Sequence, residues 1–315
     1  MQRATVCAAT SRGKLLGRRI RRSLPLYLML IPGICIYLVF RYYPMLGLQI
    51  AFKDFKLGHG IWGSPWVGLK HFENFFTQYY FSRMLINTVT LSMYSLLANT
   101  PVVIILSLCL HSLRSERMKK VVQTVVYMPH FITTVVICGI LMRMFNQRIG
   151  IFPQLFQALF GSKPDVLGNP NAFAHLYVWS GIWQNAGWGT IIYMAALSGV
   201  SPELHEAAII DGASRFKRVL HVDLPAIIPT IVIMLIMDSG RILNVGFEKI
   251  LLLQNQLNVS TSEVISTYTY KITFESSRAQ YSLATAIGLF NSAASFLMVT
   301  IVNRIAGALD QNSLW

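Results

Sequence analysis

Long apolar runs separated by short polar segments constrain the fold of this chain more than any other feature of its sequence. A helix of roughly 20 apolar residues matches the hydrocarbon thickness of a bilayer. Lipid offers backbone groups no hydrogen-bond partner, so a spanning segment must pair them internally. The sequence therefore predicts an all-α, polytopic membrane helical bundle of about six transmembrane helices. The expected spans are 24–41, 85–110, 121–142, 172–199, 226–245 and 281–302.

The amino-acid composition excludes an ordinary soluble protein. Hydrophobic residues make up 54% of the chain and charged residues only 13%, whereas soluble domains are about a quarter charged. The net charge of +14 first suggests a nucleic-acid partner. Its basic residues fall instead in particular loops between the apolar runs, as the positive-inside rule predicts. We therefore expect contact with membrane lipid and no binding of nucleic acid.

The distribution of lysine and arginine predicts the orientation of the spans. Basic residues are dense in segment 1–23, in the loop around 111–120 and in the loop around 215–218. The alternate segment 145–171 carries only Arg148 and Lys163. Positive loops stay in the cytoplasm, and no small-residue cleavage site follows the first apolar run. We expect a multi-pass protein of the bacterial inner membrane with both termini cytoplasmic and an uncleaved first span.

The loop between the fourth and fifth apolar runs is polar, charged and prone to form a helix. Ser201 is a good N-cap, Pro202 suits the first helical turn, and Glu203 complements the positive end of the helix dipole. Gly212 permits a turn or a close approach by another surface. Such a short amphipathic helix could dock in a groove of a soluble partner. The alternative is a helix that lies on the lipid surface.

The spacing of this loop also resembles a known family. Glu206-Ala207-Ala208, then Gly212, then Leu224-Pro225 resembles the cytoplasmic coupling loop of permeases of ATP-binding-cassette (ABC) importers with the type I fold. Segments 66–76, 183–190, 244–253 and 281–292 extend the likeness. Together they resemble the carbohydrate branch that serves complex polysaccharides, and within it the permeases of bacterial alginate importers. The resemblance implies half of the translocation pathway for an oligosaccharide or polysaccharide, with an alginate-like acidic polymer as the expected substrate.

The resemblance also implies partners and a layout for the chain. The expected partners are a second permease in a heterodimer, a cytoplasmic ATPase dimer and an extracytoplasmic solute-binding protein. No phosphate-binding loop occurs in this sequence, so ATP and Mg are expected on the partner ATPase. The implied ATPase-coupling residues are Glu203, Glu206, Ala207, Ala208, Asp211, Gly212 and Phe216. The expected layout is cytoplasmic segment 1–23, first span 24–41, extracytoplasmic segment 42–84, core permease domain 85–303 with its coupling loop at about 201–225, and cytoplasmic tail 304–315.

A sugar pathway needs hydrogen-bonding groups and flat aromatic faces, and the apolar runs contain both. The candidates are Trp183, Asn185, Trp188, Tyr193, Asn244, Asn291 and Arg241. The alternative for the amides is helix-to-helix bonding, and for the tryptophans an interfacial position. Asp238 and Arg241 could instead form a structural salt bridge, since they are three residues apart. For an acidic substrate, Lys249 and Lys271 join Arg241 as candidate cations.

Two other classes of protein remain alternatives. An ion-coupled secondary transporter would carry carboxylates within its spans and inverted repeats, whereas only Asp238 qualifies here and no repeat is evident. A membrane-embedded enzyme would need a polar catalytic cluster, and neither a nucleophile–base pair nor metal-ligand spacing is apparent. An ABC permease for a non-sugar solute is a third possibility. We expect a transport subunit with no catalytic residues, bound cofactor or metal of its own.

Overall fold

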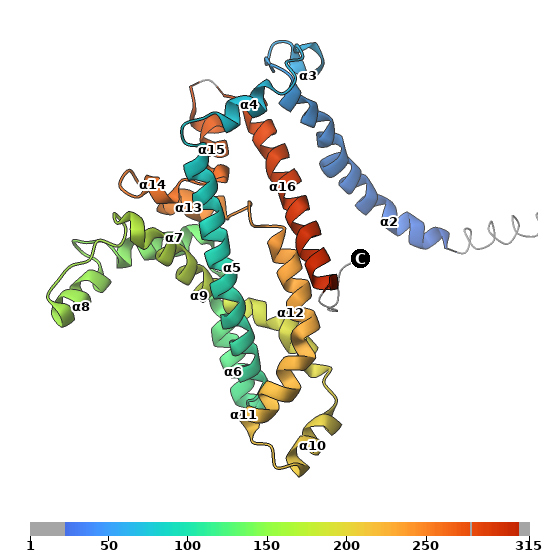
Figure 1. The fold of residues 1–315 in the computed structure, drawn as a ribbon, viewed down its shortest axis with the longest axis vertical. Coiled ribbons are helices and arrows are strands. Elements are labelled where there is room, and N and C mark those ends of the chain that lie inside the picture. Colours follow the sequence, from blue (N-terminus) through green and yellow to red (C-terminus); the bar gives the residue numbers. More distant parts are fainter. Residues whose placement is uncertain (1–22, 278, 309–315) are drawn as a thin grey trace, which may run out of the picture. The chain divides into compact units, whose positions relative to one another are not determined.

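The computed structural model describes residues 23–277 and 279–308 (Figure 1). Nearly all of the basic segment 1–23, and the tail from residue 309 onward, lie outside the described residues. The chain divides into two compact units, Met1–Lys70 and His71–Trp315, which we describe separately.

The first unit is dominated by one apolar helical run. α2 (Leu24–Tyr37), η1 (Leu38–Tyr42) and η2 (Tyr43–Phe52) follow one another without a break, and a short α3 (Gly60–Gly63) comes later. The run from Leu24 to Phe52 has 29 residues, and none of its most apolar window is buried. Such a helix suits a lipid environment. Its helical geometry continues past residue 41, through the aromatic pair that follows the expected first span.

Lys53 organises the loop that follows this run. Its ammonium group donates a hydrogen bond to the carbonyl oxygen of Ile61 at 2.9 Å and lies 4.9 Å from the centre of the Trp66 ring. The Trp62 ring lies 5.8 Å away. A cation over a tryptophan face is attracted by the ring's quadrupole. The lysine is buried while both indoles stay exposed, as suits aromatic residues at a membrane interface.

The second unit consists of helices joined by short turns. Its elements are α4 (Lys70–Phe76), α5 (Phe81–His111), α6 (Glu116–Tyr127), η3 (Met128–Phe131), α7 (Thr134–Met144), α8 (Ile151–Phe160), α9 (Pro170–Ser198), α10 (Pro202–Ile210), α11 (Arg215–Arg218), η4 (Val219–Asp223), α12 (Leu224–Ser239), α13 (Phe247–Leu253), α14 (Val259–Ser262), α15 (Ile265–Tyr270), η5 (Lys271–Glu275) and α16 (Tyr281–Ala308). This architecture confirms the predicted all-α class.

The described residues contain four helical segments that are long and apolar enough to cross a membrane: Leu24–Phe52, Phe81–His111, Arg215–Ser239 and Tyr281–Ala308. A bent pair of helices raises that number to five if it counts as one span. The fourth expected span corresponds to α9, which is long but less apolar than these four. The prediction of about six spans is therefore approximately right.

The third expected span, 121–142, is not one continuous helix. Glu116–Phe131 and Thr134–Met144 meet at an angle of 93°. Pro129 lies in the 3₁₀ turn η3, and the following Ile132 is extended. Proline lacks a backbone N–H and cannot continue the α-helical hydrogen-bond ladder. The first helix of the pair ends at Phe131, two residues after Pro129, and the bend lies at residues 132–133.

α9 is the central helix of the second unit. It packs against α5, α6, α12 and α14 (Figure 1). One apolar cluster joins Val103 of α5, Ile182 and Leu197 of α9, and Ile227 of α12. Because α9 is contacted on several sides, its polar residues must either pair with a neighbouring helix or face a cavity.

Gly187 permits the close approach of α6 to α9. A Cβ atom at this position would lie 2.2 Å from the carbonyl oxygen of Val126. Small residues commonly allow such contacts between membrane helices. We expect Gly187→Ala to lower stability by about 1–3 kcal/mol, because the backbone of α6 must move. The thermal midpoint of the detergent-solubilised protein measures this effect.

Gly139→Ala is the matched control, because no atom lies within 4 Å of a Cβ built at Gly139 in α7. Alanine is also a better helix former than glycine by about 1 kcal/mol. This control is expected to keep or raise the midpoint. Equal midpoints for both variants would contradict the close contact.

Candidate functional site

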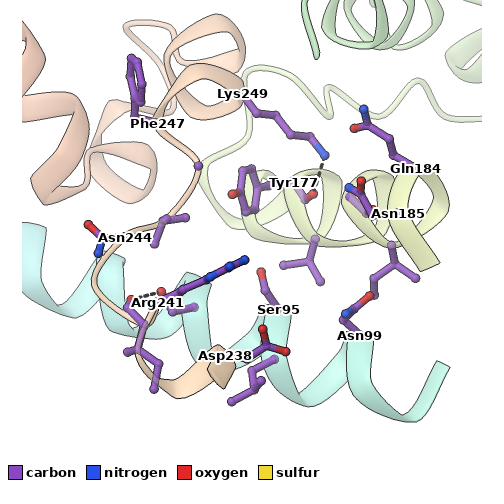
Figure 2. Close-up of a pocket in the computed structure, with 18 of the residues that line it drawn as sticks. Ser95, Asn99, Tyr177, Gln184, Asn185, Asp238, Arg241, Asn244, Phe247 and Lys249 are labelled. Atoms are coloured by element: carbon purple, nitrogen blue, oxygen red, sulfur yellow. Dashed lines mark hydrogen bonds between the residues drawn. The ribbon is translucent and has the colours of Figure 1, made fainter. Parts of the chain in front are cut away.

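A cavity of about 590 Å³ lies in the second unit. α5 and α9 form part of its wall, and the segment from the end of α12 to α13 forms another part (Figure 2). Its amides and hydroxyls come from Ser92, Ser95, Asn99, Thr134, Tyr177, Gln184, Asn185 and Asn244. A cavity of this size holds a drug-sized ligand. Its many donors and acceptors suit a hydroxylated solute.

Lys249 is the buried cation of this cavity. Its side chain reaches across to α9, where Nζ donates a hydrogen bond to the carbonyl oxygen of Tyr177 at 3.0 Å (Figure 2). The ammonium group lies 5.1 Å from the centre of the Tyr177 ring. Only 8% of the residue is exposed. Burial lowers the pKa of Lys249, in the short helix α13, to about 8.

Asp238 and Arg241 also line the cavity. The backbone N–H of Arg241 donates to the carbonyl oxygen of Asp238 at 2.9 Å. Within the described residues, however, no ion pair joins the two side chains, which lie apart in Figure 2. The salt bridge that we considered from the sequence therefore does not form in this structure. The reason is that α12 ends at Ser239, so the two residues do not share a helix face. The Arg241 guanidinium stays available to a ligand.

The structure brings together three of the residues proposed for the pathway: Asn185, Asn244 and Arg241. Asn185 also contacts His130, with 3.0 Å between its Oδ1 and the imidazole Nδ1. His130 in turn stacks on Trp188, their ring centres 4.5 Å apart. His130 thus has a packing role, and neither it nor Trp188 is among the residues that line the cavity.

The other aromatic and amide candidates lie elsewhere in the second unit. Trp183 lines a separate, apolar cavity between α7, α8 and α9. Tyr193 is buried in the cluster that joins α5, α9 and α12. Asn291 is buried in α16, and its Oδ1 has no hydrogen-bond partner among the described residues. These three residues do not line the cavity.

The cavity is also lined by four residues that are not among the pathway candidates given above: Ser92, Ser95, Tyr177 and Gln184. Ser92 and Ser95 are three residues apart on α5 and so lie on one helix face. This spacing alone could have indicated a polar face on α5. Gln184 was visible as an amide within a span, but the sequence gives no reason to choose it over its neighbours.

The loop 201–225 has the local structure that its sequence predicts. Ser201 caps α10, and its hydroxyl accepts a hydrogen bond from the N–H of Glu203 at 3.3 Å. α10 ends at Ile210, and Gly212, two residues further on, has a φ of +76°. The N–H of Ala213 donates to the carbonyl of Ala208 at 2.9 Å, and that of Gly212 to Ile209 at 3.0 Å. This pattern is a Schellman motif, which places glycine in the left-handed position.

The proposed coupling residues are almost all exposed. Glu203, Glu206, Ala207, Asp211, Gly212 and Phe216 are exposed, and Ala208 is half-buried. Large apolar side chains are uncovered beside them: Ile210 is 85% exposed and Phe216 is 77% exposed. Exposed apolar groups on a short charged helix are typical of a docking surface.

Comparison with known proteins decides the family. Residues 81–313 match the binding-protein-dependent transport system inner membrane component family. The chain belongs to this family. It is therefore the permease of an ABC importer, an inner-membrane subunit that works with a binding protein, and ATP hydrolysis belongs to a partner chain. The predicted class of transport subunit is confirmed, and nothing supports an ion-coupled transporter.

Two curated relatives from Bacillus subtilis (strain 168) cover nearly the whole permease. Protein LplB is 40% identical and covers 94% of this chain and 92% of its own length. The polygalacturonan/rhamnogalacturonan transport system permease protein YteP is 39% identical and covers 99% and 96%. A crystal structure of a bacterial alginate ABC transporter, in complex with an alginate pentasaccharide-bound periplasmic protein, contains a similar chain. The match is 36% identical with a TM-score of 0.85, and it covers 94% of this permease and 99% of that chain.

Proposed function

We propose that this permease forms half of the import pathway for an acidic oligosaccharide or polysaccharide. The observation that carries the proposal is the cavity, which combines hydrogen-bonding groups with Lys249 and Arg241. A uronate polymer presents hydroxyls and carboxylates together. Charge-assisted hydrogen bonds from lysine or arginine to a carboxylate are stronger than neutral ones. Two similar proteins support this substrate class: YteP is a polygalacturonan/rhamnogalacturonan permease, and the solved transporter is an alginate transporter.

We infer further that the exposed loop 201–225 docks on a cytoplasmic ATPase dimer, which holds ATP and Mg. The exposed apolar groups of α10 and α11 support this role. A second permease would complete the pathway as a heterodimer, and an extracytoplasmic binding protein would deliver the substrate. The basic residues within this loop, Arg215, Lys217 and Arg218, support a cytoplasmic position for it and for both termini.

Reconstitution tests this function. The permease is purified with the subunits that copurify, placed in proteoliposomes with its binding protein, and assayed for ATP hydrolysis. The panel pairs uronate oligomers with neutral oligomers of equal length. Stimulation by the uronates alone is expected. Stimulation by neutral sugars alone would support an ABC importer but contradict the acidic substrate. Uptake driven by a proton gradient without ATP would contradict both the importer and the acidic substrate.

The lowered pKa of Lys249 predicts a pH dependence. A lysine with a pKa of about 8 is charged at pH 7 and mostly neutral at pH 9. Transport of an acidic oligomer is therefore expected to weaken as pH rises through 8, relative to a neutral oligomer carried by the same complex. Initial uptake rates, measured with equal pH on both sides, test this. Lys249→Arg is the control, because arginine stays charged over this range, and its profile should be flat.

A further inference from the structure

Three side chains from distant parts of the sequence meet beside the coupling loop. His111 ends α5, His205 lies in α10, and Asp223 ends η4. The Nε2 atom of His205 is 3.1 Å from Asp223 Oδ1, and the Nε2 atom of His111 is 3.9 Å from it. One potential metal-binding atom from each residue lies within 4.8 Å of the other two.

The carboxylate at the centre of this group needs a positive partner. Asp223 is only 2% exposed, and burial of an unpaired charge is costly. The two histidine side chains are the basic groups that contact it within the described residues. His111 Nδ1 lacks a hydrogen-bond partner in the described part of the chain, and the 3.1 Å contact of Asp223 Oδ1 with His205 does not have hydrogen-bond geometry. Lys119 is close enough to act on His111 electrostatically, but no ion pair connects it with Asp223 among the described residues.

We propose that His111, His205 and Asp223 bind a divalent transition-metal ion of the Zn²⁺ class. Two imidazoles and one carboxylate form a ligand set that suits Zn²⁺ and leaves a fourth position for water. Ligand atoms around a tetrahedral Zn²⁺ lie about 3.3 Å apart. The distances from Asp223 Oδ1 to the two Nε2 atoms, 3.1 Å and 3.9 Å, are close to that spacing. The sequence did not indicate this site because the three ligands come from separate helices.

Such an ion would link α10 of the coupling loop to the end of α5 through its ligands. His205 and Ala208 are the half-buried residues of α10, while the rest of that helix is exposed. His205 therefore provides the polar side-chain contact between α10 and the ends of α5 and η4. A bound ion would hold α10 in one position for docking. Metal binding itself does not depend on the docking role proposed above, so the two can fail separately.

Metal titration of the purified complex tests this site. The complex carries an affinity tag without histidine and is free of nucleotide; the probes are Zn²⁺ in calorimetry and Co²⁺ in visible absorption. We expect one ion per permease and the visible bands of tetrahedral Co²⁺. His205→Gln should weaken binding by more than about tenfold. His221→Gln is the matched control, because His221 is an exposed neighbour whose Nδ1 contacts the Lys217 carbonyl at 2.9 Å.

A second pair of results makes the assignment specific. His205→Cys should restore binding and add a thiolate-to-Co²⁺ charge-transfer band, since cysteine is also a good ligand. Asp223→Asn should lose binding, as His205→Gln does. Equal binding by the unmodified complex and His205→Gln would overturn the proposal. An absence of tetrahedral Co²⁺ bands in the unmodified complex would also overturn it. The remaining explanation would then be an ion pair between Asp223 and a protonated histidine.

Discussion

Gly212→Phe is expected to abolish substrate-stimulated ATP hydrolysis while the permease still folds and inserts. The φ of +76° at Gly212 costs an L-residue about 1–2 kcal/mol. The turn would therefore shift, and a bulky ring would stand at the exposed end of α10. Both effects oppose docking on the ATPase. A fall in stimulated ATPase activity of more than about tenfold is expected, since 1.4 kcal/mol corresponds to a factor of ten.

The measurement compares stimulated ATPase activity and uptake in proteoliposomes that contain equal amounts of permease. No atom lies within 4 Å of a Cβ built at Gly212, so the substitution should leave the packing of the permease itself intact. Gly212→Asn is the matched control, because asparagine adopts the left-handed conformation more readily than other residues. It should keep much of the activity. Normal stimulated activity in Gly212→Phe would refute the role proposed for this loop.

Lys249→Met is expected to lower transport of acidic oligomers about ten- to a hundredfold. A hydrogen bond to a charged group contributes about 1.5–3 kcal/mol, and methionine removes the charge while keeping a similar length. Transport of a neutral oligomer by the same variant should change little. The ratio of uptake rates for the two substrates isolates the effect of charge from any loss of folded protein.

Lys271→Met provides the control for the loss of one positive charge. Lys271 does not line the cavity; its ammonium lies 3.3 Å from Glu263, which Arg83 also approaches at 3.6 Å. Lys271 was a candidate cation for an acidic substrate, but in the structure its ammonium pairs with Glu263 instead. Its substitution should affect acidic and neutral substrates equally. An unchanged substrate ratio in Lys249→Met would show that Lys249 does not contact the substrate's charge.

The sequence by itself determined the features that depend on residues close to one another along the chain. Apolar runs predict helices because lipid forces the backbone to pair internally. The cap at Ser201 and the turn at Gly212 follow from local hydrogen bonding and backbone sterics, and the structure has both. The family, too, was recognisable from the spacing of this loop and its flanking segments.

Only the tertiary structure decided which polar residues meet. The pattern of apolar residues shows that a residue lies in a helix. A central helix such as α9, however, is contacted on several sides. Its sequence therefore cannot show which of its residues face the cavity and which are buried in the apolar core. Asn185 therefore faces the cavity while Tyr193 is buried in an apolar cluster. The meeting of His111 with His205 has the same origin, because packing joins residues that the chain separates.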